Sequence, residues 1–270
     1  MSIAALDIDA VRARFGALDR RLAFFDGPGG TQCPDEVIDA IARYLREDNA
    51  NVGAPYATSQ RTDELVDAAH ERAGAFLGCT PGETAFGQSM TAMNFLLTRA
   101  FARELEPGDE VLVTRLDHDG NVAPWLALAE DIGIVVRFVD VHEDLSLDLD
   151  DLAAKRSPRT RVVAFPAAAN SVGTAPDVPR VVELAHEAGA LAWVDAVHFG
   201  PHVPSSNRCP TGSSAAGRTL YGFQLRRSSS RPNASPMCGP KIVSPAVQPR
   251  KAAARSWERS TSSSVRREVS

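Results

Sequence analysis

The stretch EVLVTRLDHDGNVAPWLALAEDI, residues 110–132, decides the fold class of this chain. Its first five residues form a short apolar run with the composition of a buried β-strand. Residues 121–132 carry apolar side chains at helical spacing, and a polar loop lies between the two segments. A buried strand that leads directly into a helix is the unit from which parallel α/β sheets are built.

The same alternation continues on both sides of this stretch. Short apolar runs predict further strands at 83–87, 134–141, 161–165 and 191–195. Amphipathic segments predict helices at 91–105, 149–155 and 177–188. Two earlier helices are expected, one that follows Pro34 and one that opens at Thr62 and closes at Gly78. The pattern predicts an α/β fold with a mostly parallel, buried sheet over residues 1–204.

The composition changes abruptly at Ser205. Residues 205–270 hold 10 Arg, 2 Lys, 2 Glu and no Asp, a charge of +10, so the first 204 residues carry -15 of the total of -5. The same segment has 15 Ser but only 8 Leu, Ile, Val and Phe in 66 residues, which is below the ~20% typical of a foldable core. We therefore divide the chain into a domain at 1–204 and a tail at 205–270, for which disorder is expected.

Two other interpretations of the tail remain open. A basic arm that binds nucleic acid or acidic lipid is disfavoured, because its arginines are scattered among serines without a helical stripe. A frameshift close to Pro204 fits better. The whole chain has 26 Arg and 3 Lys, as expected of coding DNA rich in G and C, which read out of frame tends to give Ser, Arg, Pro and Ala.

Several classes of protein are disfavoured by the sequence. It has no signal-peptide pattern and no run of 18 apolar residues, so neither secretion nor a membrane span is expected. The four cysteines lie far apart, with no spacing typical of zinc: Cys33, Cys79, Cys209 and Cys238. We expect a cytoplasmic protein without a disulfide framework or a metal site.

Polar residues follow three of the predicted strands at their carboxyl ends. Asp195 ends the strand at 191–195, His118 and Asn121 follow the strand at 110–114, and Asn170 follows the strand at 161–165. Alone, Asp195 is compatible with a helix cap, His118 with a solvated loop and Asn170 with a turn. Because ligands of open α/β sheets bind beyond the carboxyl ends of the strands, the residues together predict a binding site there.

A second candidate feature is the segment GQSMT, residues 87–91, which passes from a predicted strand directly into a helix. Backbone N–H groups at such a helix start, together with the hydroxyls of Ser89 and Thr91, can bind a phosphate group. The alternative is an ordinary helix cap.

Five segments, in this order along the chain, resemble the class V aminotransferase superfamily, and in particular its cysteine-desulfurase-like subgroup. They are residues 24–32 (FFDGPGGTQ), 89–94 (SMTAMN), 118–125, 170–174 and 195–198, within a similarity that covers about residues 20–204. The resemblance implies a fold-type-I large domain that uses pyridoxal 5'-phosphate (PLP). It also implies an amino-acid substrate, reaction through an aldimine, and a homodimer.

The resemblance assigns seven residues to the cofactor: Ser89, Met90, Thr91, His118, Asn170, Asp195 and His198. Asp195 would pair with the pyridine nitrogen, His118 would lie over the ring, and Asn170 and His198 would hydrogen-bond the phenolic oxygen. The other three would hold the phosphate, Met90 through its backbone N–H alone. His198 stands where desulfurases commonly have Gln, and Met90 where a hydroxyl residue is common.

The lysine that forms the Schiff base in this family is missing. It is expected about 25 residues after Asp195, but Tyr221 stands there, and the chain has only Lys155, Lys241 and Lys251. The family's C-terminal small domain has no match either. We therefore expect a truncated, catalytically incomplete chain that binds PLP non-covalently at best. A non-catalytic PLP- or partner-binding protein and a nucleic-acid binder remain the alternatives.

Overall fold

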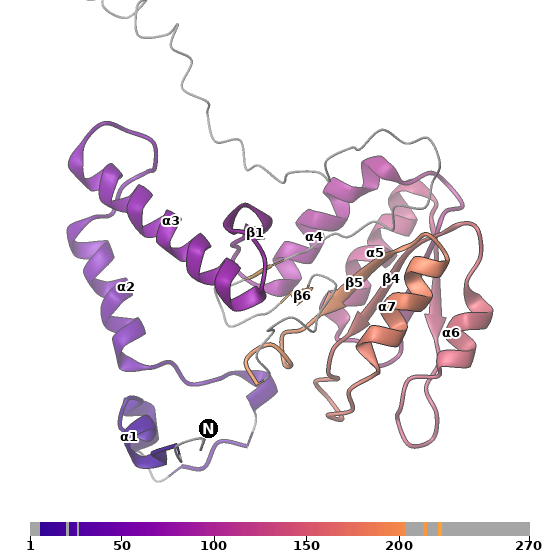
Figure 1. Ribbon diagram of the computed structural model, residues 1–270, viewed down its shortest axis with the longest axis horizontal. Helices are drawn as coiled ribbons and strands as arrows, with labels where there is room; N and C mark the ends of the chain where they lie inside the picture. The colour runs from indigo at the N-terminus through magenta and orange to yellow at the C-terminus, as the bar shows by residue number, and fades with distance from the viewer. Residues whose placement is uncertain (1–5, 20–21, 26, 203–212, 215–220, 223–270) are drawn as a thin grey trace, which may run out of the picture.

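The computed structural model describes residues 6–19, 22–25, 27–202, 213–214 and 221–222. Figure 1 shows two parts, an N-terminal arm of helices and an α/β domain. The arm consists of α1 (Ile8–Arg12), α2 (Asp35–Glu47) and α3 (Ala57–Leu77). Short 3-10 turns are formed by Gly16–Asp19, Gly27–Gly29, Pro81–Glu83 and Ala102–Glu104.

The domain is built on a five-stranded sheet in which all neighbours are parallel. The strands are β2 (Glu110–Thr114), β3 (Val135–Val139), β4 (Thr160–Pro166), β5 (Leu191–Asp195) and β6 (Ser213–Ser214). Their order across the sheet is β3-β2-β4-β5-β6. The predicted parallel α/β fold is therefore confirmed, and four of its strands lie where the apolar runs placed them.

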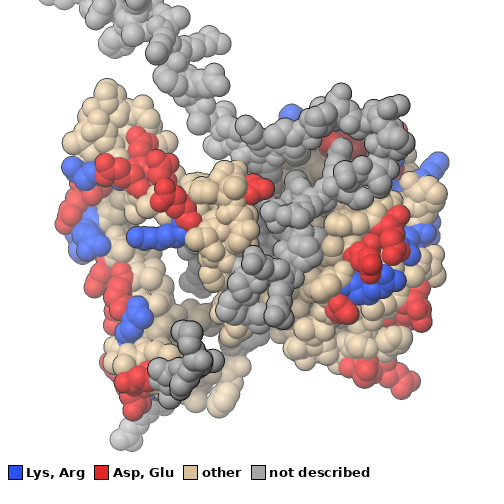
Figure 2. Space-filling view, viewed as in Figure 1, with Lys and Arg blue, Asp and Glu red and all other residues tan. Residues whose placement is uncertain are grey.

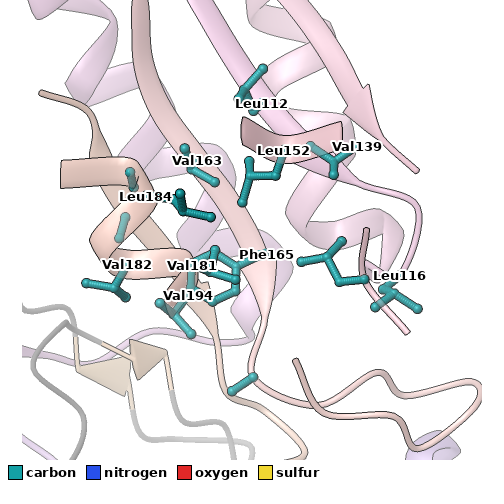
Figure 3. Close-up of a cluster of buried hydrophobic side chains, with 14 of the residues drawn as sticks. Leu112, Leu116, Val139, Leu152, Val163, Phe165, Val181, Val182, Leu184 and Val194 are labelled. Carbon is teal, nitrogen blue, oxygen red and sulfur yellow. The ribbon is translucent and has the colours of Figure 1, made fainter. Parts of the chain in front are cut away.

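Helices cover both faces of the sheet (Figure 1). Residues of α4 (Met90–Phe101) and α5 (Asp119–Ile132) pack with one set of strand residues, and residues of α6 (Leu149–Lys155) and α7 (Val178–Glu187) pack with the other. Side chains of a strand alternate between faces. Val162 and Ala164 of β4 accordingly face α4 and α5, while Val163 and Phe165 face α6 and α7. Figure 3 shows the second of these clusters.

Side-chain caps explain why the helices of the domain begin where they do. Asp148 accepts a hydrogen bond from the N–H of Asp151 at 2.8 Å at the start of α6. Asp177 does the same for the N–H of Arg180 at 3.1 Å at the start of α7. Each cap satisfies one of the N–H groups that a helix start leaves without an internal acceptor.

The helix expected to open at Thr62 begins five residues earlier, at Ala57. The Thr62 hydroxyl donates to the carbonyl of Thr58 at 3.0 Å, and the Ser59 hydroxyl donates to the carbonyl of Asn51 at 2.6 Å. Both hydroxyls are therefore satisfied within or beside the helix instead of capping it. The predicted end at Gly78 is confirmed, because Gly78 has a φ of 70° in the left-handed region.

The strand expected at 83–87 is the second difference. Only Thr84–Ala85 (β1) is a strand, and it pairs antiparallel with β7 (Tyr221–Gly222) outside the main sheet. The Thr84 hydroxyl is bonded locally, to the carbonyl of Pro81 at 2.7 Å and to Nδ1 of His70 at 2.6 Å. These bonds fix the segment against α3 rather than at the edge of the parallel sheet.

Of residues 205–270 the structure describes β6 and β7 alone. The boundary at 204 and the disorder expected beyond it therefore stay predictions, and Cys209, Cys238, Lys241 and Lys251 lie outside the described residues.

Candidate cofactor site

The carboxyl ends of β2 and β5 bring an acid and two histidines into one neighbourhood. Asp195, the last residue of β5, is buried, with 6% of its surface exposed. His118 and His198 both interact electrostatically with its carboxylate. His118 caps α5 just beyond β2, and His198 follows β5 in a turn closed by the N–H of Gly200 on the carbonyl of Ala196 at 2.7 Å.

Asp195 has an incomplete set of hydrogen-bond donors. Its Oδ1 accepts from the N–H of Val197 at 2.9 Å, and its Oδ2 accepts no bond from any described residue. Burial raises the pKa of Asp195, which the Val197 bond and the two imidazoles only partly offset. A carboxylate in this state favours a cationic N–H partner, because such a partner would supply both a donor and a compensating charge.

The start of α4 offers backbone donors to an anion. The Ser89 hydroxyl accepts from the N–H of Ala92 at 3.2 Å, and the Ser89 carbonyl accepts from the N–H of Met93 at 3.0 Å. The N–H groups of Met90 and Thr91, the first two residues of the helix, have no acceptor within it. Met90 is 7% exposed and its side chain packs in the core, whereas Ser89 and Thr91 are exposed. Met90 can therefore offer only its backbone.

Gly120 holds the start of α4 close to His118. A Cβ atom at position 120 would lie 2.6 Å from Oγ1 of Thr91 and 3.0 Å from Nδ1 of His118, so one or both of these side chains would have to shift. The two candidate regions, for an anion and for a ring, thus meet at this glycine. Nδ1 of His118 accepts from the N–H of Gly120 at 2.9 Å, so the neutral ring carries its proton on Nε2.

Asn170 lies in a loop beyond β4. The loop is closed by backbone bonds from Ala169 to Thr174 at 2.8 Å and from Gly173 to Ala169 at 2.9 Å. Asn170 is partly buried, and among the described residues its side chain makes no hydrogen bond to Asp195, to His198 or to its own turn. The structure places it beyond the carboxyl end of β4, as predicted, without a hydrogen bond to the other candidates among the described residues.

Asn121 is enclosed in the protein interior, although its place after β2 had suggested a residue open to a ligand. Its side chain is 0% exposed and donates to Asp117 at 2.9 Å. Burial is the main cause that raises the pKa of Asp117 to about 7, and the nearby Asp195 raises it further. Sequence reasoning missed Asp117 and also Asn94, which is polar on the buried face of α4 and bonds to Asn121 at 3.1 Å. Asn94 stands one turn after Met90, and an amide on the mostly apolar face with Met90, Met93 and Leu97 was the signal available.

Lys155 is the only lysine among the described residues, and it does not belong to this site. Its amine donates to the carbonyl of Phe138 at 2.7 Å, to Asp151 at 2.6 Å and to Asp140 at 3.1 Å. The bond to Asp151 is the largest cause that raises the pKa of Lys155. A charged, triply bonded ammonium is not a nucleophile.

The described part of the chain has neither a cluster of metal ligands nor a membrane-spanning helix. No group of three or more His, Cys, Asp or Glu side chains there is arranged to hold a metal ion. Its helices include none with the length and apolar character needed to cross a membrane.

The parallel sheet, the buried acid at the end of β5 and the free helix start define the large domain of fold-type-I PLP enzymes. Residues 23–207 match the model of the family described as aminotransferase class-V. The chain belongs to this family, as the sequence motifs predicted. Class V aminotransferases are a PLP-dependent family.

Relatives in this family include cysteine desulfurases. The probable cysteine desulfurase 1 of Mycobacterium leprae is 32% identical over 206 residues, which are 73% of this chain and 34% of the relative. The aminotransferase-like protein FGM3 of Gibberella zeae is 33% identical over 210 residues, 75% of this chain and 52% of the relative. The chain thus spans between a third and about half of the length of these curated relatives.

Solved structures support the fold. The cysteine desulfurase CsdA of Escherichia coli superposes with a TM-score of 0.72 at 25% identity, over 81% of this chain and 58% of that protein. A C-DES mutant with glycine covalently linked to its PLP cofactor superposes with a TM-score of 0.66 at 19% identity, over 80% of this chain and 59% of that protein. The second likeness shows the fold alone.

Proposed function

We propose that the α/β domain binds PLP non-covalently at the carboxyl ends of β2 and β5, and that this chain does not complete the family's reaction. One observation carries the proposal. Asp195 is a buried carboxylate whose Oδ2 lacks a donor among the described residues, and it lies at the sheet edge beside His118. A protonated pyridine nitrogen supplies the donor and the positive charge that this carboxylate lacks.

The remaining residues would hold the other parts of the cofactor. The N–H groups of Met90 and Thr91, with the hydroxyls of Ser89 and Thr91, are donors for the phosphate at a helix start that favours negative charge. His118 would lie against the ring, with its orientation fixed by the Gly120 N–H. His198 and Asn170 would serve the phenolic oxygen; neither side chain has a hydrogen-bond partner among the described residues.

In this family the bound cofactor acts as an electron sink for reactions of amino acids. Asp195 supports that role by keeping the ring nitrogen protonated. Among the described residues no lysine replaces the missing Schiff-base residue, because Lys155 is engaged on α6. The substrate class that follows from the relatives is an amino acid. We further propose a cytoplasmic location and a homodimer, as expected for the family. A nucleic-acid function would depend on residues 205–270.

The test is a PLP titration of the full chain against Asp195→Ala, followed by absorbance and fluorescence, with Asp150→Ala, at an exposed residue of α6, as the control. A hydrogen bond to a charged group contributes about 1.5–3 kcal/mol. The Asp195 variant should therefore bind about ten- to a hundredfold more weakly, and the control should bind like wild type. Equal affinities would remove Asp195 from the site. A stoichiometric adduct on one lysine after borohydride reduction would overturn non-covalent binding.

A further inference from the structure

A chain of hydrogen bonds that is buried except at the half-buried Asp117 links the elements that carry the candidate site. Asp117 accepts from the Thr114 hydroxyl at 2.9 Å through Oδ2 and from Nδ2 of Asn121 at 2.9 Å through Oδ1. Oδ1 of Asn121 accepts from Nδ2 of Asn94 at 3.1 Å. Thr114, Asn121 and Asn94 are each at most 1% exposed. The chain therefore connects the end of β2 to the first turn of α5 and the second turn of α4.

The Asn94 amide also meets a need that the sequence of α5 creates. Pro124 lies inside this helix and has no N–H, so the carbonyl of Gly120, four residues earlier, loses its ordinary helical donor. Nδ2 of Asn94 donates to that carbonyl at 3.0 Å. An amide of α4 thus completes the backbone of α5 at Gly120, where a Cβ would touch both Thr91 and His118.

We propose that Asp117 and Asn94 are positioning residues that lock the start of α4 to the start of α5. They thereby fix His118 relative to the backbone donors of Met90 and Thr91. Neither residue touches the cofactor; both act through Asn121, Gly120 and the backbone. The cofactor part of this inference rests on the proposed function, whereas the locking of the two helices does not.

The hydrogen-bond donors around Asp117 require an acceptor at both side-chain oxygen positions. The N–H of Thr114 faces Oδ2 at 3.3 Å, and the amide of Asn121 faces Oδ1. Asp117→Asn keeps the shape of the side chain but turns an NH2 group toward one of these donors. Turning the Asn121 amide in response would set its NH2 group against that of Asn94. An answering turn of Asn94 would take its NH2 group away from the Gly120 carbonyl. The substitution should therefore loosen the turn that carries His118 without opening a cavity.

The first measurement is amide hydrogen exchange on the full chain without cofactor. We expect Asp117→Asn to lower the protection of the Gly120 and Asn121 amides at least tenfold, while Val163 in β4 keeps its protection. Asp119→Asn is the matched control, because it removes the same charge from an exposed residue two positions away. Unchanged protection of Gly120 in Asp117→Asn would refute the positioning role.

The second variant, Asn94→Ala, breaks the chain from α4 and withdraws the donor to the Gly120 carbonyl. It should lower the protection of the Gly120 and Asn121 amides as well. The double variant with Asp117→Asn and Asn94→Ala should lose less free energy of protection than the two single variants together, because residues of one network are coupled. Strictly additive losses would contradict a single chain. This variant also decides the matter if Asp117→Asn fails to fold.

Cofactor binding provides the final readout. In a PLP titration, Asp117→Asn should bind about tenfold more weakly than wild type. At saturating PLP, the induced circular dichroism of the bound ring should differ because His118 has shifted. If wild type binds no PLP, the proposed function fails, and the exchange experiment still decides the positioning role. If wild type binds PLP and the variant matches it in affinity, dichroism and exchange, the positioning role alone fails.

Discussion

Two acids at the carboxyl edge of the sheet have their pKa values raised, mainly by burial, yet their surroundings differ. Asp117 accepts three hydrogen bonds from Thr114 and Asn121, so its donors are all supplied by the protein. Asp195 accepts one from Val197, and its second oxygen is left for another donor. The difference between a positioning acid and a ligand-binding acid therefore lies in the number of protein donors around each.

The raised pKa of Asp117 makes stability depend on pH. Its carboxyl has a pKa of about 7 in the folded chain against the ordinary 3.8, so the folded state retains a proton that the unfolded state has lost between these values. Its contribution to stability is complete below pH 3.8 and is lost as the pH rises through about 7. We expect the urea midpoint of wild type to fall, relative to that of Asp117→Asn, as the pH rises from 5 to 8.

The comparison with the variant isolates Asp117, because Asp195, whose raised pKa has the same sign, and His186, whose lowered pKa has the opposite sign, are present in both proteins. Asp119→Asn should show no such pH-dependent difference from wild type. A constant offset between wild type and Asp117→Asn across this range would show that the Asp117 pKa is not raised on folding.

For single residues, the sequence predicts a role best where that role follows from a place at the end of a strand or helix. Asp195 and His118 lie where strand ends and family motifs placed them. Asn121 was misplaced, and Asp117 and Asn94 were missed. Their partners come from another helix, as the bond from Asn94 to Asn121 across 27 positions illustrates, and such pairing has no local signature.

Helix α3 shows how an element is fixed by backbone contact. A Cβ on Gly74 would lie 2.8 Å from the carbonyl oxygen of Cys79 and 3.0 Å from the nitrogen of Pro81. These are backbone atoms of the turn that follows the helix, and the N–H of Cys79 is already bonded to the carbonyl of Gly74 at 2.9 Å. The turn cannot move away without breaking that bond.

We therefore expect Gly74→Ala to destabilise the chain, although alanine is about 1 kcal/mol better than glycine within a helix. Forcing a methyl group into a packed contact costs about 1–3 kcal/mol. The matched control is Gly82→Ala in the same turn, where a Cβ meets nothing within 4 Å and should be tolerated. Urea titration of both variants decides the point, and a Gly74→Ala protein as stable as wild type would show that the turn yields.

The elements themselves could be predicted well where apolar periodicity and caps agree. The strand at Glu110–Thr114 and the helix at Leu149–Lys155 have the expected bounds. The start of α3 could not be predicted, because Ser59 and Thr62 resemble caps but are hydrogen-bonded to carbonyls instead. The pairing of β1 with β7 depends on contact between residues far apart in the sequence, such as Thr84 and Gly222, which are 138 positions apart.

The α/β domain buries its apolar side chains in a core, whereas the N-terminal arm leaves most of its apolar side chains exposed. None of the residues of α1 or α2 is buried, although α2 carries the apolar stripe that the sequence predicted. Its members Val37, Ile38, Ile41 and Leu45 are 44–58% exposed. In Figure 2, the arm carries charges of both signs beside uncharged surface rather than a face of a single sign. The described arm thus exposes apolar side chains that a stable domain would cover.

This exposure leads us to expect poor solubility and a broad, weakly cooperative melt of the purified chain. A dye that binds exposed apolar surface, such as ANS, should fluoresce in its presence at 25 °C. Replacing Ile38 and Ile41 by Lys should reduce the dye signal while leaving the far-UV circular dichroism unchanged. A sharp cooperative transition without dye binding would contradict the expectation.

The last prediction concerns the change of composition near residue 204. The family match extends over residues 23–207, and the charge changes there from -15 over the first 204 residues to +10 over the last 66. Selection for a folded domain does not produce such a boundary inside a continuous family pattern, whereas a change of reading frame in G- and C-rich DNA does. We expect another frame near codon 204 to encode a lysine about 25 residues after Asp195, followed by roughly 150–200 further residues, enough for the rest of a fold-type-I domain and a small domain.

Sequencing the gene and translating all frames is the measurement. The absence of such a lysine from every frame would refute the frameshift. Its presence would predict that a corrected chain binds PLP covalently, with an adduct at that lysine after borohydride reduction, whereas the chain with Tyr221 would form none.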